Sequence, residues 1–257
     1  MINIEKAKQE FKEYTSKYDK THPKVRYKIE HTYRVAKNCQ KIAKELGLNE
    51  QEQQLAEIIG LLHDIGRFEQ IRIYNSTYDA ETVDHADLGV KILFEDGEIK
   101  RFVEDSTYHE IIYKAIKNHN KYKIEDGMNE KEILFSKIIR DADKLDIYKV
   151  ITDEKIEDAV AKKTPDIRKE ILSDNVYESF IKGELVSYKN MKSNIDHIVI
   201  WLAYIYDFNF GGAFKIIQEN DYINKIIAKV DYLDLQTKER MENIKAKANE
   251  YVKNKII

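Results

Sequence analysis

Histidine and aspartate residues recur through the amino-terminal part of this chain, each on or beside a helical apolar pattern. They are His31, the pair His63 and Asp64, His85, His119 and Asp143. Imidazole and carboxylate groups are the ligands that divalent zinc, iron, manganese and nickel accept. Six such groups delivered to one point would make a metal site, and we expect it to hold two ions. The sequence therefore predicts a metal centre as its main functional feature.

The composition predicts a mainly helical protein that is large enough to bury a sizeable core. Only 2 Pro and 9 Gly interrupt the 257 residues, and strong helix formers dominate. The 43 basic and 46 acidic side chains leave a net charge of −3. This balance does not require a polyanion or a membrane surface as partner, so we expect no nucleic acid and no membrane.

We expect no signal that would direct the chain out of the cytoplasm. No stretch approaches the roughly 18 uninterrupted apolar residues of a membrane helix, and the amino terminus is charged throughout. Cys39 is the single cysteine and cannot build a disulfide framework. We expect Cys39 to be a buried small residue in its helix, and the protein to be cytoplasmic.

Apolar periodicity and helix-ending signals predict one helix after another up to residue 150. The expected helices cover about residues 2–19, 25–46, 50–63, 85–94, 106–118 and 130–150. Residues 67–84 lack periodicity and are expected to form a long loop that borders the site. In the helix over 130–150, Asp141 and Asp143 flank the apolar stripe on opposite sides, so periodicity alone does not choose between them.

The character of the chain changes after residue 150. Residues 151–193 are polar and contain Pro165, which predicts short helices. The apolar segment from Ile195 predicts a buried helix that ends at Gly211 and Gly212, and residues 222–255 predict a pair of charged amphipathic helices. Without internal repeats or a convincing linker, residues 1–257 are expected to form a single all-α domain.

Three histidines lie outside this constellation. We expect surface roles for His22 and His109, and a core position with a hydrogen bond for His197 on the apolar segment.

The order and context of the remaining residues resemble the HD superfamily of metal-dependent phosphohydrolases. His31 lies in HTYRVA, His63 and Asp64 in LLHDIGR, and the distant aspartate in IIRDADKLDIY. The resemblance covers about residues 25–150 and implies an HD-domain helical bundle, with residues 151–257 as a carboxy-terminal helical extension. It favours Asp143 as the last ligand, with Asp141 as the fallback or as a partner of a ligand.

Members of that superfamily with two metals add two histidines between the His-Asp pair and the last aspartate. His85 in DHADLGVKIL and His119 in IKNHNK match these positions. The resemblance then implies that Asp64 bridges two divalent ions, with His31, His63 and Asp143 on one and His85 and His119 on the other. Iron, manganese, nickel, zinc and magnesium all remain open.

Two such ions would activate a hydroxide for attack on phosphorus, and nearby cations would neutralise the phosphoryl oxygens. Arg67 and Lys144 match basic positions that contact phosphate in relatives, so Asp64, Arg67 and Lys144 are the expected catalytic residues. Arg34 and Asp87 are candidates to orient the ligand imidazoles.

The implied activity is hydrolysis of a phosphate ester or anhydride of a small metabolite, and we expect this metabolite to be a nucleotide. The Gly-Tyr-Pro signature of cyclic-dinucleotide phosphodiesterases is absent, since His119 is followed by NKYKIEDGMN. The alternative is an HD-fold di-iron oxygenase, because the same ligand pattern occurs there, and a noncatalytic ligand-binding module is the third possibility. The sequence leaves the oligomeric state open.

Overall fold

The computed structural model describes residues 2–156 and 166–256, which divide into two compact units, Met1–Asp143 and Lys144–Ile257. All regular structure within these residues is helical, which confirms the all-α class. No helix in the described ranges is long and apolar enough to cross a membrane. The boundary falls inside α8 (Glu130–Asp153), near the expected end of the HD core. The expectation of one domain over residues 1–257 stays a prediction.

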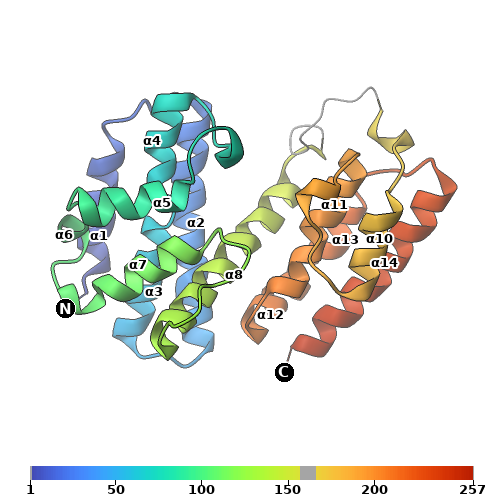
Figure 1. The fold of residues 1–257 in the computed structure, drawn as a ribbon. Helices are drawn as coiled ribbons and strands as arrows, with labels where there is room; N and C mark the ends of the chain where they lie inside the picture. The colour runs from blue at the N-terminus through green and yellow to red at the C-terminus, as the bar shows by residue number, and fades with distance from the viewer. Residues whose placement is uncertain (1, 157–165, 257) are drawn as a thin grey trace. The chain divides into compact units, whose positions relative to one another are not determined.

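The first unit contains the predicted helices in the predicted order, together with two that were not predicted, α4 and α6 (Figure 1). They are α1 (Ile4–Thr15), α2 (Pro23–Glu45), α3 (Glu50–Leu62), α4 (Ile65–Tyr74), α5 (His85–Val90), α6 (Ile99–Phe102), α7 (His109–Asn118) and the first part of α8. A π-helical turn, Lys91–Glu95, continues α5, and 3-10 turns occupy Asp79–Glu81 and Ser106–Tyr108.

The paired helices α2 and α3 bring His31 and His63 together. Asn49 and Glu52 form a capping box that starts α3, and the helix ends at His63. Gly60 lies so close to α2 that an added Cβ would stand 2.7 Å from the Ala36 Cα and 2.9 Å from the Cys39 sulfur. These small side chains let the two helix backbones approach closely, and Cys39 is fully buried as predicted.

The segment expected as a loop over 67–84 is partly helical, so that prediction was wrong for its first half. Residues 65–74 form α4, in which Phe68 and Ile71 are buried three residues apart. Asn75 ends the helix in the left-handed conformation, at φ 49°. Ile65 precedes the segment expected as a loop, and the two buried apolar residues within it gave too weak a periodicity to recognise the helix.

Gly66, at the start of α4, allows the backbone of α5 to pass directly over it. A Cβ at Gly66 would lie 2.3 Å from the His85 carbonyl oxygen and 2.7 Å from the Gly89 nitrogen. Because Gly66 is two residues from Asp64, this close crossing fixes the start of α5, and with it His85, beside Asp64.

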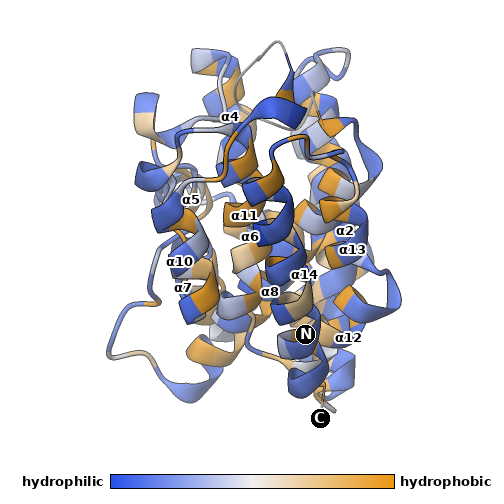
Figure 2. Cartoon of the chain, turned by 90° about the vertical axis from the view of Figure 1, so that its right-hand side faces the viewer, coloured by the Kyte–Doolittle hydropathy of each residue, from blue (hydrophilic) through white to orange (hydrophobic). Residues whose placement is uncertain are grey.

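The second unit contains α10 (Asp174–Lys182), α11 (Asn194–Leu202), α12 (Gly211–Glu219), α13 (Tyr222–Ile227) and α14 (Leu235–Lys255). Residues of α11 are buried throughout, and its ribbon is largely orange in Figure 2, which confirms the buried apolar helix. Gly211 and Gly212 begin α12 and do not end α11, because a 3-10 turn at Ala203–Asp207 and extended backbone at Phe208 and Phe210 separate the two helices. Pro165 lies outside the described residues.

We predict that Gly66→Ala destabilises the protein by about 2 kcal/mol, because the methyl group meets backbone atoms that cannot rotate away. Gly89→Ala is the matched control on the other side of the same crossing. A Cβ at Gly89 finds its nearest neighbours at 3.5 Å, so we expect no loss of stability. Urea unfolding followed by circular dichroism measures both variants, and equal stability of the two would contradict the close crossing.

Candidate metal centre

Four imidazoles meet around the carboxylate of Asp64, all from elements of the first unit. Oδ2 of Asp64 lies 3.4 Å from Nε2 of His31 and 3.6 Å from Nε2 of His63. Oδ1 lies 3.4 Å from Nε2 of His85 and 4.0 Å from Nε2 of His119. Each carboxylate oxygen therefore faces one pair of histidines. The two groups, His31–His63–Asp64 and Asp64–His85–His119, each have the geometry to hold a metal ion, and all five residues are buried.

Hydrogen bonds on the outer ring nitrogens determine which nitrogen of three imidazoles faces the centre. Nδ1 of His63 donates to the Gly60 carbonyl at 2.7 Å, and Nδ1 of His119 donates to the Ile116 carbonyl at 2.6 Å. Nδ1 of His85 donates to the Asp79 carboxylate. A neutral imidazole with a proton on Nδ1 has its lone pair on Nε2. Three of the four inward nitrogens are thus prepared to accept a cation.

Two of these lone pairs face each other at close range. Nε2 of His85 and Nε2 of His119 are 2.9 Å apart, although both rings carry their protons on Nδ1. Burial and the neighbouring His85 and His63 lower the pKa of His119 to about 3, so a proton does not fill the gap near neutral pH. Burial likewise lowers the pKa of His63. The donor set therefore fits a bound cation.

Asp64 is ionised in spite of its burial. Burial opposes its ionisation, but the charge of Lys28 and the surrounding imidazoles outweigh burial and hold the pKa of Asp64 well below its usual range. Lys28 Nζ lies 2.7 Å from Oδ2 of Asp64, and Arg67 Nε lies 3.6 Å from Oδ1. Lys28 was not among the residues selected from the sequence. Its position three residues before His31 on one helix face was the signal that could have found it.

The helix register of α8 places Asp143 at the cluster. Oδ1 of Asp143 lies 3.3 Å from Nε2 of His31 and 3.8 Å from Nε2 of His63. Burial opposes its ionisation, but these two histidines hold the pKa of Asp143 far below its usual range. Asp141 is fully buried. Neither aspartate belongs to the two groups of candidate ligands named above, so the contacts of Asp143 with His31 and His63 are what support it as a ligand.

Asp79 orients His85, a role that the sequence suggested for Asp87. The Asp79 carboxylate accepts the Nδ1 proton of His85 and also contacts Arg67. Burial raises the pKa of Asp79, but His85 and Arg67 reverse that effect and hold it well below its usual range. Asp87 points to Lys121 at 3.1 Å. Asp79 lies in an aperiodic segment before His85, so no sequence pattern marked it.

The two cations expected to contact phosphate have different surroundings. Arg67 donates to Asp79, to the Thr77 carbonyl at 2.6 Å and to Gln70 at 2.8 Å. Its buried Nε has no hydrogen-bond partner among the described residues. Lys144 belongs to the second unit, where it pairs with Asp207 at 2.7 Å. The roles expected of Lys144 and Arg34 stay predictions.

His22 and His109 are partly exposed and make polar contacts. His197 lies in the core as expected, but the expected hydrogen bond is not found at its buried Nδ1, which has no partner within the described residues. His22 Nε2 contacts the Asn75 side chain at 3.1 Å, and His109 Nε2 donates to the Val103 carbonyl at 2.8 Å. His197 packs against Trp201 with ring centroids 3.9 Å apart, and burial lowers its pKa to about 4.

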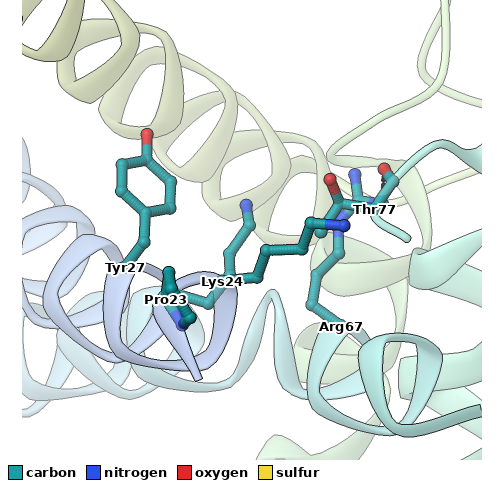
Figure 3. A pocket seen from close by; sticks show the side chains of 6 residues that line it. Pro23, Lys24, Tyr27, Arg67 and Thr77 are labelled. Atoms are coloured by element: carbon teal, nitrogen blue, oxygen red, sulfur yellow. Dashed lines mark hydrogen bonds between the residues drawn. The ribbon is translucent and has the colours of Figure 1, made fainter. Parts of the chain in front are cut away.

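The first unit also holds a cavity of about 380 Å³, and Figure 3 draws the side chains that line it. It is lined by Pro23, Lys24, Tyr27, Lys28, Arg67 and Thr77. Two of these residues, Lys28 and Arg67, also contact Asp64, so the cavity and the cluster share side chains. Its volume is in the range of small-molecule sites.

Comparisons with known proteins agree with this geometry. Residues 29–148 match the HD domain family. A stretch of 44 residues is 46% identical to the 3'3'-cGAMP-specific phosphodiesterase 1 of Vibrio cholerae serotype O1, and covers 17% of this chain and 10% of that protein. No solved structure matches the chain significantly. An HD domain with a buried His/Asp cluster is typical of metal-dependent phosphohydrolases.

We predict that Asp79→Asn weakens manganese binding by about 10- to 100-fold, because His85 loses the carboxylate that orients it. Asp87→Asn is the matched control, since its carboxylate pairs with Lys121, and it should bind manganese like the wild type. Calorimetric titration measures both. A larger loss in Asp87→Asn than in Asp79→Asn would refute the assignment.

The two aspartates of α8 provide a second test. Asp143→Asn should lose manganese, because it removes the charge beside His31 and His63. Asp141→Asn should retain most of it. Metal content by elemental analysis after purification compares the two, and the reverse order would show that Asp141 is the ligand.

Proposed function

Since residues 29–148 form an HD domain of the phosphohydrolase type around a buried His/Asp cluster, we propose that this protein cleaves a phosphate ester or anhydride of a small nucleotide at a two-metal centre. His31, His63 and Asp143 would hold one ion, His85 and His119 the other, and Asp64 would offer one oxygen to each. The observation that carries this proposal is the 2.9 Å approach of two imidazole lone pairs beside an ionised Asp64.

The bound ions would supply an acidified water as nucleophile and would offset charge on the phosphoryl group. The chain's own residues hold that arrangement in place. Asp79, Gly60 and Ile116 fix the rings of His85, His63 and His119 through Nδ1, so that each Nε2 points inward without rearrangement.

Lys28 and Arg67 supply the positive charge that phosphoryl transfer needs. Charge spreads over the equatorial oxygens as the bond to the leaving group breaks, and preorganised cations stabilise it. Both side chains already contact Asp64, and both line the cavity. Within the part of the chain that the structure describes, the buried Nε of Arg67 has no hydrogen-bond acceptor, and a phosphoryl oxygen would satisfy it.

A nucleotide is the substrate that the surroundings favour. The cavity beside the cluster has cationic side chains and an aromatic ring, and its volume suits a small molecule. The similar protein of Vibrio cholerae is named for its action on 3'3'-cGAMP, which is itself made of nucleotides. We therefore propose a small phosphorylated nucleotide as the substrate class.

We predict phosphate release from nucleotides in the presence of manganese and the absence of oxygen. Asp64→Asn should lose both metal and activity while retaining its helical circular dichroism. Arg67→Gln should keep its metal but lose about two orders of magnitude in kcat, comparable to removing one oxyanion donor. Colorimetric phosphate assays under nitrogen measure these rates.

The same assay separates hydrolase from oxygenase. Activity that needs iron and oxygen, with every phosphoester left intact, would contradict the hydrolase and favour the di-iron oxygenase.

A further inference from the structure

The face of α2 that carries His31 also carries three residues that precede it in the helix. Lys28, Tyr27 and Lys24 stand three, four and seven residues before His31, the spacing that places side chains on one helix face. With a rise of 1.5 Å per residue, Lys28 is about 4.5 Å and Lys24 about 10 Å from His31 along the helix axis. This face therefore runs from the cluster into the cavity, and a phosphoryl group bound at the cluster would not extend as far as Lys24.

The cavity is strongly cationic, although the chain as a whole has a net charge of −3. Its six lining residues include Lys24, Lys28 and Arg67 and no carboxylate. Lys28 and Arg67 are partly balanced by Asp64. Lys24 donates to the carbonyl oxygen of Asn75, and no carboxylate pairs with it within the described residues. Its charge is thus available to a ligand that carries negative charge beyond the scissile group.

Tyr27 adds an aromatic ring to this cationic wall. The ring lies nearly parallel to that of His31, with an interplanar angle of 8° and centroids 6.2 Å apart. Tyr27 is 37% exposed and lines the cavity (Figure 3). An accessible tyrosine beside lysines is a combination that recognises nucleotides, because a base stacks on the ring while the lysines contact phosphate.

We propose that this cavity is a specificity subsite for a nucleotide with at least two phosphoryl groups. The phosphoryl group next to the scissile one lies against Lys24, and the base lies against Tyr27. This inference rests on the proposed function, because it places the terminal phosphoryl group at the Asp64 cluster. Lys24 and Tyr27 then select the substrate without taking part in bond cleavage.

The test uses Lys24→Gln and Tyr27→Leu in the full chain with manganese, and compares adenosine diphosphate, adenosine monophosphate and inorganic pyrophosphate. Lys24→Gln should raise KM for adenosine diphosphate about tenfold, with a smaller rise for the monophosphate, because one charge-assisted contact is lost. Tyr27→Leu should raise KM for the adenosine diphosphate about tenfold and leave that for pyrophosphate unchanged. In both variants kcat should change less than KM.

Matched controls lie on the same helix outside the cavity. Lys37→Gln removes an exposed lysine of α2, and Tyr33→Leu removes a tyrosine with the same exposed fraction as Tyr27, 37%. Both should keep wild-type KM values. If Lys24→Gln and Tyr27→Leu act equally on all three compounds, or act no more than their controls, the subsite is refuted while the hydrolase stands.

If the wild type hydrolyses none of these compounds, a binding measurement shows whether the subsite fails together with the proposed hydrolysis. Calorimetry with manganese-loaded protein then measures binding of adenosine diphosphate directly. Binding that weakens about tenfold in Lys24→Gln and in Tyr27→Leu, but not in the controls, supports the cavity as a nucleotide site although the proposed hydrolysis fails. Absence of binding to the wild type overturns the subsite.

Discussion

The convergence of four imidazoles on the two oxygens of one buried carboxylate is the constraint around which the first unit is organised. Asp64 follows directly after α3, and its oxygens face His31 and His63 on one side and His85 and His119 on the other. Such an approach needs helix backbones that nearly touch. Gly60 provides it between α2 and α3, and Gly66 provides it between α4 and α5. Side chains at either glycine would separate the ligand-bearing segments.

This buried cluster of polar side chains does little to stabilise the folded state. Removing a carboxylate from water costs several kcal/mol unless opposite charge and hydrogen bonds replace the water. Here Lys28 and Arg67 balance part of the charge of Asp64, while the lone pairs of His85 and His119 still face each other. A hydrophobic cluster of the same volume would stabilise the fold at least as well. The cluster is therefore better explained by the cation that it can bind than by the fold that surrounds it.

The sequence indicated which residues meet at this cluster where that depends on residue type and helical spacing. Each predicted ligand from His31 to Asp143 lies at the cluster, because the helices that carry them have clear apolar periodicity and end signals. Asp79 could not be found in this way, since the segment before α5 is irregular and its contact with His85 depends on tertiary structure. The helix α4 was missed for a related reason: its burial is set by the neighbouring helices and leaves little periodicity in its own sequence. Gly211 and Gly212 were misread because glycine marks both ends of helices.

The candidate metal ligands and the cations beside them carry different information about the reaction. Six imidazole and carboxylate groups suit several divalent ions, and they suit hydrolysis as well as oxygen activation. The charge beside them favours a substrate that carries phosphorus, since phosphoryl groups need cations at fixed positions whereas oxidation of a neutral carbon skeleton does not. Lys28 and Arg67 meet that need, and both contact Asp64 and line the cavity. Because α2 carries His31 and Lys28 on one face, helix geometry sets the distance between this candidate ligand and this cation, so under the proposed function a single rigid element would couple substrate position to metal position.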